Sequence, residues 1–373
     1  MNFTNFNLEE FMGFGDDSNP ILWAIWIIPI VLFVFYGQRI QLQITSNEIK
    51  KNISKLSRFK EDSREELLKY IKNNLNPTKD PTLKIDRLVD YFTIMPVDMD
   101  PGGIIPKVRH VVRSREDNTR EQIKAMFSDI SELERTKVQT LIEIVTSLQM
   151  LYKIVNHLYL TAKKQNNYPL ILPLQMMMPF IMEEANALNE AVPVFKKGQP
   201  IGDGIGPMVV GKMMLGTKKQ LPTFETVCSE TTYEGRKLFL IKANGPSATV
   251  GRPAEAIEIL VAQNKPQIVI MVDASLKLEG EDSASVSQGF GAAIGGIGTE
   301  RFQIEEIATK HSIQVFAIVI KQSVKEAINL MTKEVADRAE EVRSQIYEII
   351  NDNTSAGQTV FVVGVGNTLG VSQ

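Results

Sequence analysis

One stretch constrains the fold of this chain more than any other, the segment from Lys265 to Lys321. It holds two apolar runs, Ile268–Val272 and Val315–Ile320, separated by a polar loop, a glycine-rich loop (Gly289 to Gly298) and a helix-like segment. Short apolar runs without alternation are typical of strands that are buried on both faces. Strand, crossover helix and strand form the unit of a parallel sheet. The stretch therefore predicts an α/β domain.

The first of these strands runs into an aspartate, Asp273. In open parallel sheets, ligands bind beyond the carboxyl ends of the strands, so Asp273 is the first candidate for a functional residue. The segments Lys237–Ala243 and Thr359–Val363 are predicted to be further strands, and each ends at small or polar residues. A helix is expected from Pro253, and a charged amphipathic helix over Gln322–Asn351. Together these elements predict a mostly parallel sheet with a crevice at one edge.

A second aspartate, Asp203, lies in the motif GDGIGP in front of a helix-like run. If the domain contains one parallel sheet, Asp203 and Asp273 face the same crevice. Paired carboxylates can share a proton, activate a water or hold a metal, and we expect these two to be catalytic. A divalent metal is the cofactor that the pair suggests. The alternative is that both aspartates only cap backbone amides.

Glycine loops at the strand ends are expected to bind the backbone of a substrate, because a glycine loop before a helix leaves N–H groups free. The predicted substrate-binding residues are Gly204, Gly206, Asn244, Gly245, Gly251, Gly296, Gly298, Gly366 and Asn367.

Composition limits the other classes of function. The formal net charge is −3 and the sequence pI is about 5.9, so no nucleic acid is expected as a partner. The single cysteine, Cys228, excludes an intrachain disulfide and suits a reducing compartment. The histidines, His110, His157 and His311, show no metal-ligand spacing.

The N-terminal part contains an uncharged apolar run, residues 21–37, after a short tail, residues 1–20. This run is at the short end of what a membrane-spanning helix needs, about 17–25 residues. Trp23, Trp26 and Tyr36 are suited to the membrane interface, and basic residues follow from Arg39 onward. The positive-inside rule then predicts a single-pass protein of the cell membrane with the tail outside and the rest cytoplasmic. A buried core helix is the alternative.

Residues 38–197 are predicted to be a helical region, followed by the α/β domain over 198–373. The helix over Gln41–Asn74 suits a membrane surface or a partner, and oligomers could form through the helical region. The segment Tyr91–Pro106 is expected to be a loop whose Asp98 and Asp100 either bind a cation or lie in a solvated turn.

Two further features of the helical region lead to predictions. Residues 132–164 form one long amphipathic pattern, whereas Pro169, Pro173 and Pro179 are expected to kink or break the next helix. Between these prolines, Met176–Met178 either forms an adaptable binding surface or packs in a core.

Several motifs of the C-terminal half resemble the bacterial spore germination proteases. They are ANGPSATVGRPAEAIEIL, KPQIVIMVDAS and GGIGTERFQIEEIATKHSIQVFAIVI, in that order. GDGIGP is similar to the D-x-x-G-P element of that family and of the hydrogenase maturation proteases, and VVGVGNTLG to the strand and G-x-G-N turn that precede it there. Because this strand ends the present chain, the resemblance implies a circularly permuted α/β fold. The C-terminal strand would then lie beside Gly202 to Pro207.

The resemblance implies that Asp203 and Asp273 match the acidic site residues of the family. Hydrogenase maturation proteases add a histidine after the second acid, but none lies between Asp273 and His311 here. The G-x-G-N turn also resembles peptidyl-tRNA hydrolases, whose catalytic histidine has no evident match. The chain as a whole resembles an uncharacterised archaeal membrane-anchored family, a domain of unknown function.

Two hypotheses follow. The chain is either a membrane-tethered cytoplasmic hydrolase, in particular a peptidase acting on a peptide or protein through Asp203 and Asp273, or a non-catalytic module that binds a ligand or acts as a scaffold in a membrane complex.

Overall fold

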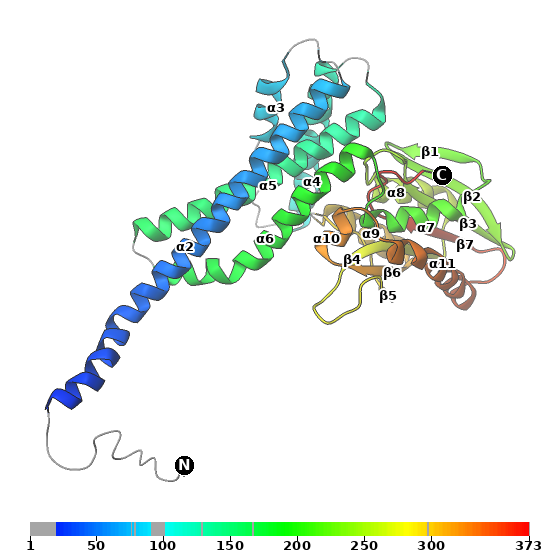
Figure 1. Ribbon diagram of the computed structural model, residues 1–373. Coiled ribbons are helices and arrows are strands. Elements are labelled where there is room, and N and C mark those ends of the chain that lie inside the picture. The colour runs from blue at the N-terminus through cyan, green and yellow to red at the C-terminus, as the bar shows by residue number, and fades with distance from the viewer. Residues whose placement is uncertain are drawn as a thin grey trace, which may run out of the picture. The chain divides into compact units, whose positions relative to one another are not determined.

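The computed structural model describes residues 20–75, 77, 80–90, 101–127, 130–165, 168–296 and 298–372, without the side chains of residues 20–26, 33–35, 38–39, 41–42, 101–102 and 168–170. The chain divides into two compact units. The first comprises Met1–Lys55 and Lys153–Pro179, and the second Leu56–Tyr152 and Phe180–Gln373. Three long helices contribute to both units, namely α2 (Pro20–Asn74), α5 (Glu132–Lys164) and α6 (Tyr168–Lys197) (Figure 1).

The first unit is built from parts of these three helices. Ile49 of α2, Val155 of α5 and Leu174 of α6 are buried in it. The hydroxyl groups of Ser46 and Tyr159 lie 3.1 Å apart and form a hydrogen bond between α2 and α5. The bounds of α5 confirm the long amphipathic helix expected over residues 132–164.

Of the kink or break that the prolines predict, the break is wrong, because α6 is one helix of 30 residues. The kink stays a prediction. Pro169 lies in its first turn, where the missing N–H has no intrahelical partner. Pro173 and Pro179 each remove one helical hydrogen bond. Burial of Leu174 and Met178 offsets that cost and keeps the helix continuous.

Among the residues that the structure describes, no helix is long and apolar enough to cross a membrane. The predicted span, residues 21–37, falls in α2, but the side chains of residues 21–26 and 33–35 lie outside the described residues. The membrane anchor therefore stays a prediction. Asp98 and Asp100 also lie outside the described residues.

The second unit contains two further helices of the helical region, α3 (Thr82–Val89) and α4 (Pro101–Met126). The prediction that the loop from Tyr91 extends to Pro106 is therefore wrong, since residues 101–106 form the start of α4. The reason is that proline is favoured in the first turn of a helix, and Pro101 opens this one.

A seven-stranded sheet forms the centre of the second unit, in the order β1-β2-β3-β7-β4-β6-β5 (Figure 1). Its strands are β1 (Lys219–Thr223), β2 (Thr226–Tyr233), β3 (Arg236–Ala243), β4 (Ile268–Leu276), β5 (Val286–Phe290), β6 (Gln314–Gln322) and β7 (Thr359–Gly364).

The sheet is mixed, so the prediction of a mostly parallel sheet is correct only for its centre. Strands β3, β7, β4 and β6 are parallel, whereas β1 and β2 on one side and β5 on the other pair antiparallel. A tight turn explains one antiparallel pair. Glu234 and Gly235 both have positive φ, as two-residue hairpins between twisted strands require, and they join β2 to β3.

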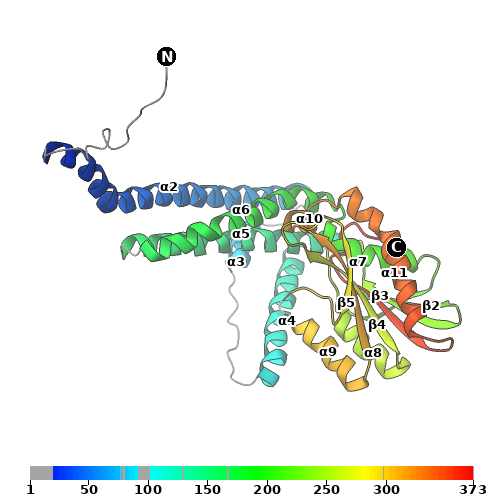
Figure 2. The ribbon, with the colours of Figure 1, turned by 90° about the horizontal axis from the view of Figure 1, so that it is seen from below.

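Helices cover both faces of the sheet. The short helix η1 (Gly202–Gly204) leads into α7 (Ile205–Met213), which packs with α11 (Lys333–Asn353) on one face. Helices α8 (Pro253–Asn264) and α9 (Thr299–His311) cover the other face (Figure 2). The helix expected over Gln322–Asn351 is divided in two, because Ser323 caps a separate short helix, α10 (Val324–Ile328).

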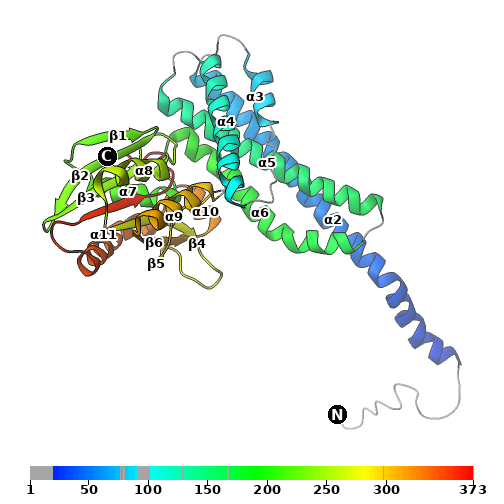
Figure 3. The same ribbon diagram turned by 180° about the vertical axis from the view of Figure 1, so that it is seen from behind.

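The last strand of the chain occupies the centre of this sheet. β7 pairs with β3 on one side and β4 on the other (Figure 3). The side chains of Val360 to Val363 are buried. Beyond its end, the N–H of Val365 donates to the carbonyl oxygen of Val272 at 2.8 Å. A Cβ atom on Gly364 would lie 2.5 Å from the carbonyl oxygen of Gly206, and the N–H of Asn367 donates to Asp203 at 2.7 Å. These contacts confirm the predicted position of the C-terminal strand beside Gly202 to Pro207.

Candidate functional site

The two predicted aspartates lie at the carboxyl ends of the central strands. Asp203 is held in η1, next to the turn that follows β7. Asp273 is the sixth residue of β4, whose pairing with β6 continues as far as Leu276. The strand is thus longer than its apolar run, and the side chain of Asp273 is only 6% exposed.

Close backbone packing fixes the position of Asp203. A Cβ atom on Gly366 would lie 1.9 Å from the carbonyl oxygen of Asp203, and Gly366 has a φ of +132°. A Cβ atom on Gly206 would lie 2.3 Å from the carbonyl oxygens of both Val272 and Val365. Only glycine permits these approaches, so the glycines of GDGIGP and VVGVGN bring η1, β4 and β7 together.

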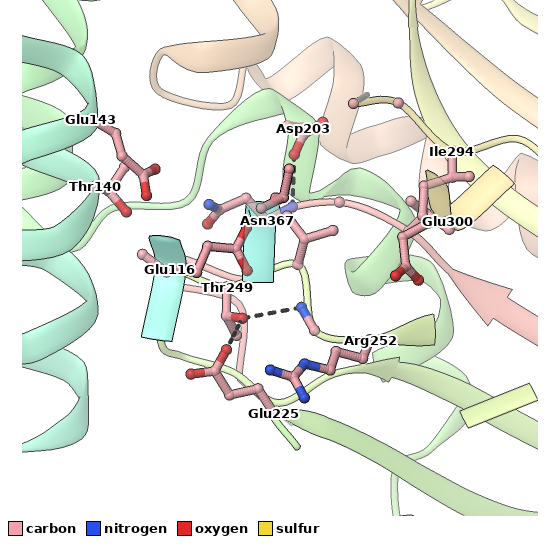
Figure 4. A pocket seen from close by; sticks show the side chains of 18 of the residues that line it. Glu116, Thr140, Glu143, Asp203, Glu225, Thr249, Arg252, Ile294, Glu300 and Asn367 are labelled. Atoms are coloured by element: carbon pink, nitrogen blue, oxygen red, sulfur yellow. Dashed lines mark hydrogen bonds between the residues drawn. The ribbon is translucent and has the colours of Figure 1, made fainter. Parts of the chain in front are cut away.

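The carboxylate of Asp203 is bound by the backbone. Its Oδ2 atom accepts a hydrogen bond from the N–H of Asn367 at 2.7 Å (Figure 4). Burial raises the pKa of this carboxyl group, and the hydrogen bond from Asn367 opposes the increase.

The environment of Asp273 favours its protonated form. Burial, followed by the negative charge of Asp203, raises the pKa of Asp273 to about 8. Hydrogen bonds from the N–H groups of Ala274 and Gly295 and the charge of Arg301 oppose the increase. At neutral pH, Asp273 therefore carries a proton while facing a second acid, and the two carboxyl groups are electrostatically coupled.

Both aspartates line a cavity of about 460 Å³. This volume lies within the range of about 300–1,000 Å³ that is usual for small-molecule sites. The α/β part supplies the floor, and the helices α4 and α5 supply a wall (Figure 4). The residues of this wall are Arg109, Val112, Arg113, Glu116 and Arg120 of α4 and Thr136, Gln139, Thr140 and Glu143 of α5.

The cavity brings together most, but not all, of the predicted site residues. Besides the two aspartates, Gly251, Gly296, Gly298, Gly366 and Asn367 line it. Gly204, Gly206, Asn244 and Gly245 do not, and their positions have packing reasons. A Cβ atom on Gly204 would lie 2.8 Å from the carbonyl oxygen of Asn367, and one on Gly245 would lie 1.8 Å from that of Val371. The N–H of Asn244 donates to the carbonyl oxygen of Glu225 at 2.9 Å.

Sequence reasoning missed the wall and the ion pairs beside it. Arg120 lies 2.9 Å from Glu225 and 4.4 Å from the ring centre of Phe224, and Arg252 stacks near the same ring. The signal was present in α4, because Arg109, Arg113, Glu116 and Arg120 recur at the spacing of one helix face.

Among the residues that the structure describes, no three or more histidine, cysteine, aspartate or glutamate side chains form a group that could hold a metal ion. The divalent metal that Asp203 and Asp273 suggest therefore stays a prediction.

Two family models match the chain. One, described as "Protein of unknown function (DUF1512) N-terminal domain", covers residues 23–198. The other, described as "Domain of unknown function (DUF1512) C-terminal", covers residues 201–372. The chain therefore belongs to the DUF1512 family. A search of curated proteins gave no match.

Proposed function

We propose that the cavity is the active site of a peptidase in which Asp203 and Asp273 act as an acid–base pair. One observation carries the proposal. Two coupled carboxyl groups lie at the floor of a cavity, and the pKa of Asp273 is raised to about 8. Burial raises the pKa of both groups, and the charge of Asp203 raises that of Asp273 further. Two neighbouring carboxyl groups that share one proton are a known arrangement for acid–base catalysis.

The chemistry requires one charged and one protonated carboxyl group. The carboxylate of Asp203 accepts a proton from a water molecule, whose oxygen attacks the carbonyl carbon of the peptide bond. Asp273 donates its proton to the carbonyl oxygen. The tetrahedral intermediate then collapses. One of its hydroxyl groups returns a proton to Asp273 as the C=O bond re-forms, the C–N bond breaks, and the leaving nitrogen takes the proton that Asp203 accepted and departs as an amine. Gly251, Gly296 and Gly298 offer backbone groups for binding the substrate.

The test is hydrolysis of a mixture of peptides by the full chain, followed by mass spectrometry, with and without divalent metals. Asp203→Asn and Asp273→Asn should each reduce turnover by about 10²–10⁴-fold. Asp337→Asn, an exposed change on α11, is the matched control. Cleavage that persists undiminished in both site variants would refute the acid–base pair.

A tether to the membrane is part of this proposal. The described side chains of residues 27–32 are apolar and largely exposed, and exposed apolar runs mark interaction surfaces. In the proposal, residues 21–37 cross the membrane, residues 1–20 lie outside the cell, and residues 38–373 face the cytoplasm. Flotation of the full chain with lipid vesicles, lost in a chain that starts at Gln41, is the expected result. Equal flotation of the two would contradict the tether.

A scaffold role is the second candidate, and exposed side chains on α6 favour it. Leu172, Met176 and Met177 are 46%, 75% and 57% exposed, whereas Met178 is buried. Flexible methionines are common at adaptable binding surfaces. The mass of the full chain in solution tests self-association through this surface. A higher-order species that Met176→Ser combined with Met177→Ser dissociates would support it, and a monomer would contradict it.

A further inference from the structure

The charged side chains of the cavity differ in whether they form an ion pair within the protein. Three of its arginines contact carboxylates. Arg120 lies 2.9 Å from Glu225, and Arg113 lies 3.5 Å from Glu300. Arg252 lies 3.7 Å from Asp117. These groups are compensated without a ligand.

The fourth arginine, Arg109, is different. It lines the cavity from α4, and it has no carboxylate within 4 Å among the described residues. Its Nε atom is shielded from solvent and has no hydrogen-bond acceptor. An arginine in a cavity without a neighbouring carboxylate is suited to bind the carboxylate or phosphate of a ligand through two N–H groups of its guanidinium.

Two carboxylates of the same wall also lack an ion pair among the described residues. They are Glu116 of α4 and Glu143 of α5, and both side chains are open to the cavity (Figure 4). Glu143 accepts a weak hydrogen bond, 3.3 Å long, from Gln139. Burial raises the pKa of Glu143, and the charge of Glu116 raises it further, whereas the hydrogen bond from Gln139 and the charges of Arg115 and Arg120 oppose the increase. Burial also raises the pKa of Glu116, and the charges of Arg252, Arg120 and Arg113 oppose the increase. A cation between Glu116 and Glu143 would favour the charged form of both groups.

The spacing of these charges is set by the helix. Arg109 and Glu116 are seven residues apart, so they lie on one face of α4, about 10.5 Å apart along its axis. An extended peptide spans at most about 3.3–3.6 Å per residue, so a peptide of three residues spans about 10 Å. The spacing of the two positions along α4 is therefore similar to the distance between the two termini of a tripeptide.

We propose that the cavity binds short peptides, of about three residues, that have both termini free. Arg109 binds the terminal carboxylate, and Glu116 with Glu143 binds the terminal ammonium group. This inference rests on the proposed peptidase function, for which it names the substrate class. Longer chains and chains with blocked ends lack one of the two charges at the required distance.

The test measures binding to the full chain by calorimetry, with trialanine, N-acetyl-trialanine and trialanine amide as probes. Trialanine should bind at least about tenfold more tightly than either blocked form, since a hydrogen-bonded charge pair is worth about that factor. Arg109→Gln should remove the preference for the free acid over the amide. Glu116→Gln should reduce the preference for the free amine over the acetylated form.

Two exposed changes on the same helix, Glu121→Gln and Lys124→Gln, are the matched controls and should leave all three affinities unchanged. Retained thermal stability of each variant excludes unfolding as the cause. Absence of trialanine binding, or equal binding of all three probes, would overturn the inference. So would preferences that persist in both cavity variants.

The outcome separates this inference from the function on which it rests. Tight binding of trialanine without its cleavage would support the binding site and refute the peptidase. Cleavage of blocked or long peptides with no preference for free ends would support the peptidase and refute this binding site.

Discussion

The floor and the wall of the cavity differ in whether their charged groups have partners within the protein. On the floor, Asp203 and Asp273 are bound by backbone N–H groups and enclosed by close glycine packing. On the wall, Arg109, Glu116 and Glu143 have no ion pair among the described residues and are open to the cavity. The protein thus satisfies the groups that we assign to chemistry, and leaves unsatisfied the groups that we assign to recognition.

This difference has a physical basis. A catalytic acid must be held in one position with a shifted pKa, which requires burial and fixed hydrogen bonds. A side chain that recognises a ligand contributes most to binding when it has no partner in the free protein, because an existing ion pair must be broken before the ligand can bind. Changes on the floor should therefore affect folding as well as turnover, whereas changes on the wall should affect binding alone.

The largest effect is expected from the packing beneath the floor. Gly206→Ala places a Cβ atom 2.3 Å from two carbonyl oxygens, those of Val272 and Val365. Val272 is paired within β4, and the N–H of Val365 is hydrogen-bonded to Val272, so neither backbone can move freely. We expect a loss of at least about 3 kcal/mol of stability. Urea denaturation followed by far-UV circular dichroism measures it. Gly289→Ala, at an exposed position with nothing within 4 Å, is the control. Equal stability of the two variants would show that the floor is not rigid.

The second effect concerns the proton of Asp273. Its pKa is about 8 in the folded chain and about 3.9 in the unfolded chain, so the folded state holds a proton that the unfolded state releases between these values. Stability should fall as the pH rises from about 4 to about 8, by up to about 1.4 kcal/mol per unit from this group. Asp273→Asn removes that decrease. The free energy of unfolding of the variant, relative to that of the wild type, should therefore be higher at pH 8 than at pH 5.

Thermal denaturation at the two pH values checks this prediction, with Asp337→Asn as the control for a change of charge at an exposed position. A stability difference between wild type and Asp273→Asn that is the same at both pH values would contradict the shifted pKa.

The smallest effect is expected on the wall. Glu116→Gln and Glu143→Gln should each change stability by no more than about 0.5 kcal/mol, because these side chains are open to the cavity and have no ion pair among the described residues. The measurement is the same urea denaturation. A loss above about 1 kcal/mol would show that the protein itself uses these charges, and the contrast between floor and wall would disappear.

The floor could be predicted from the sequence because its signals are local. Asp273 directly follows an apolar run, and Asp203 lies between glycines in front of a helix. The position of the last strand beside Asp203 could also be predicted, because VVGVGN ends in the small residues that a close approach requires. The antiparallel edges of the sheet were missed, since short strands such as β5 carry few apolar residues.

The charged stripe of the wall is visible in the sequence, but it could not be assigned to the site, because about 60 to 160 residues of sequence separate it from the aspartates. The stripe from Arg109 to Arg120 is equally consistent with a solvated helix face. Only the packing of α4 and α5 distinguishes these alternatives. The role of the glycines at the strand ends could not be predicted either. A glycine needed for packing, such as Gly206 or Gly245, has the same sequence pattern as one that binds a ligand.

The coupling between the two aspartates is the central claim, and the titration of Asp273 tests it most directly. Carboxyl ¹³C resonances of aspartate-labelled full chain can be followed with pH, and Asp273→Asn identifies the signal. We predict a pKa of about 8 in the wild type and a lower value in Asp203→Asn, because that change removes a neighbouring negative charge. A pKa near the ordinary value of about 3.9, or one that is unaffected by Asp203→Asn, would contradict the acid–base pair.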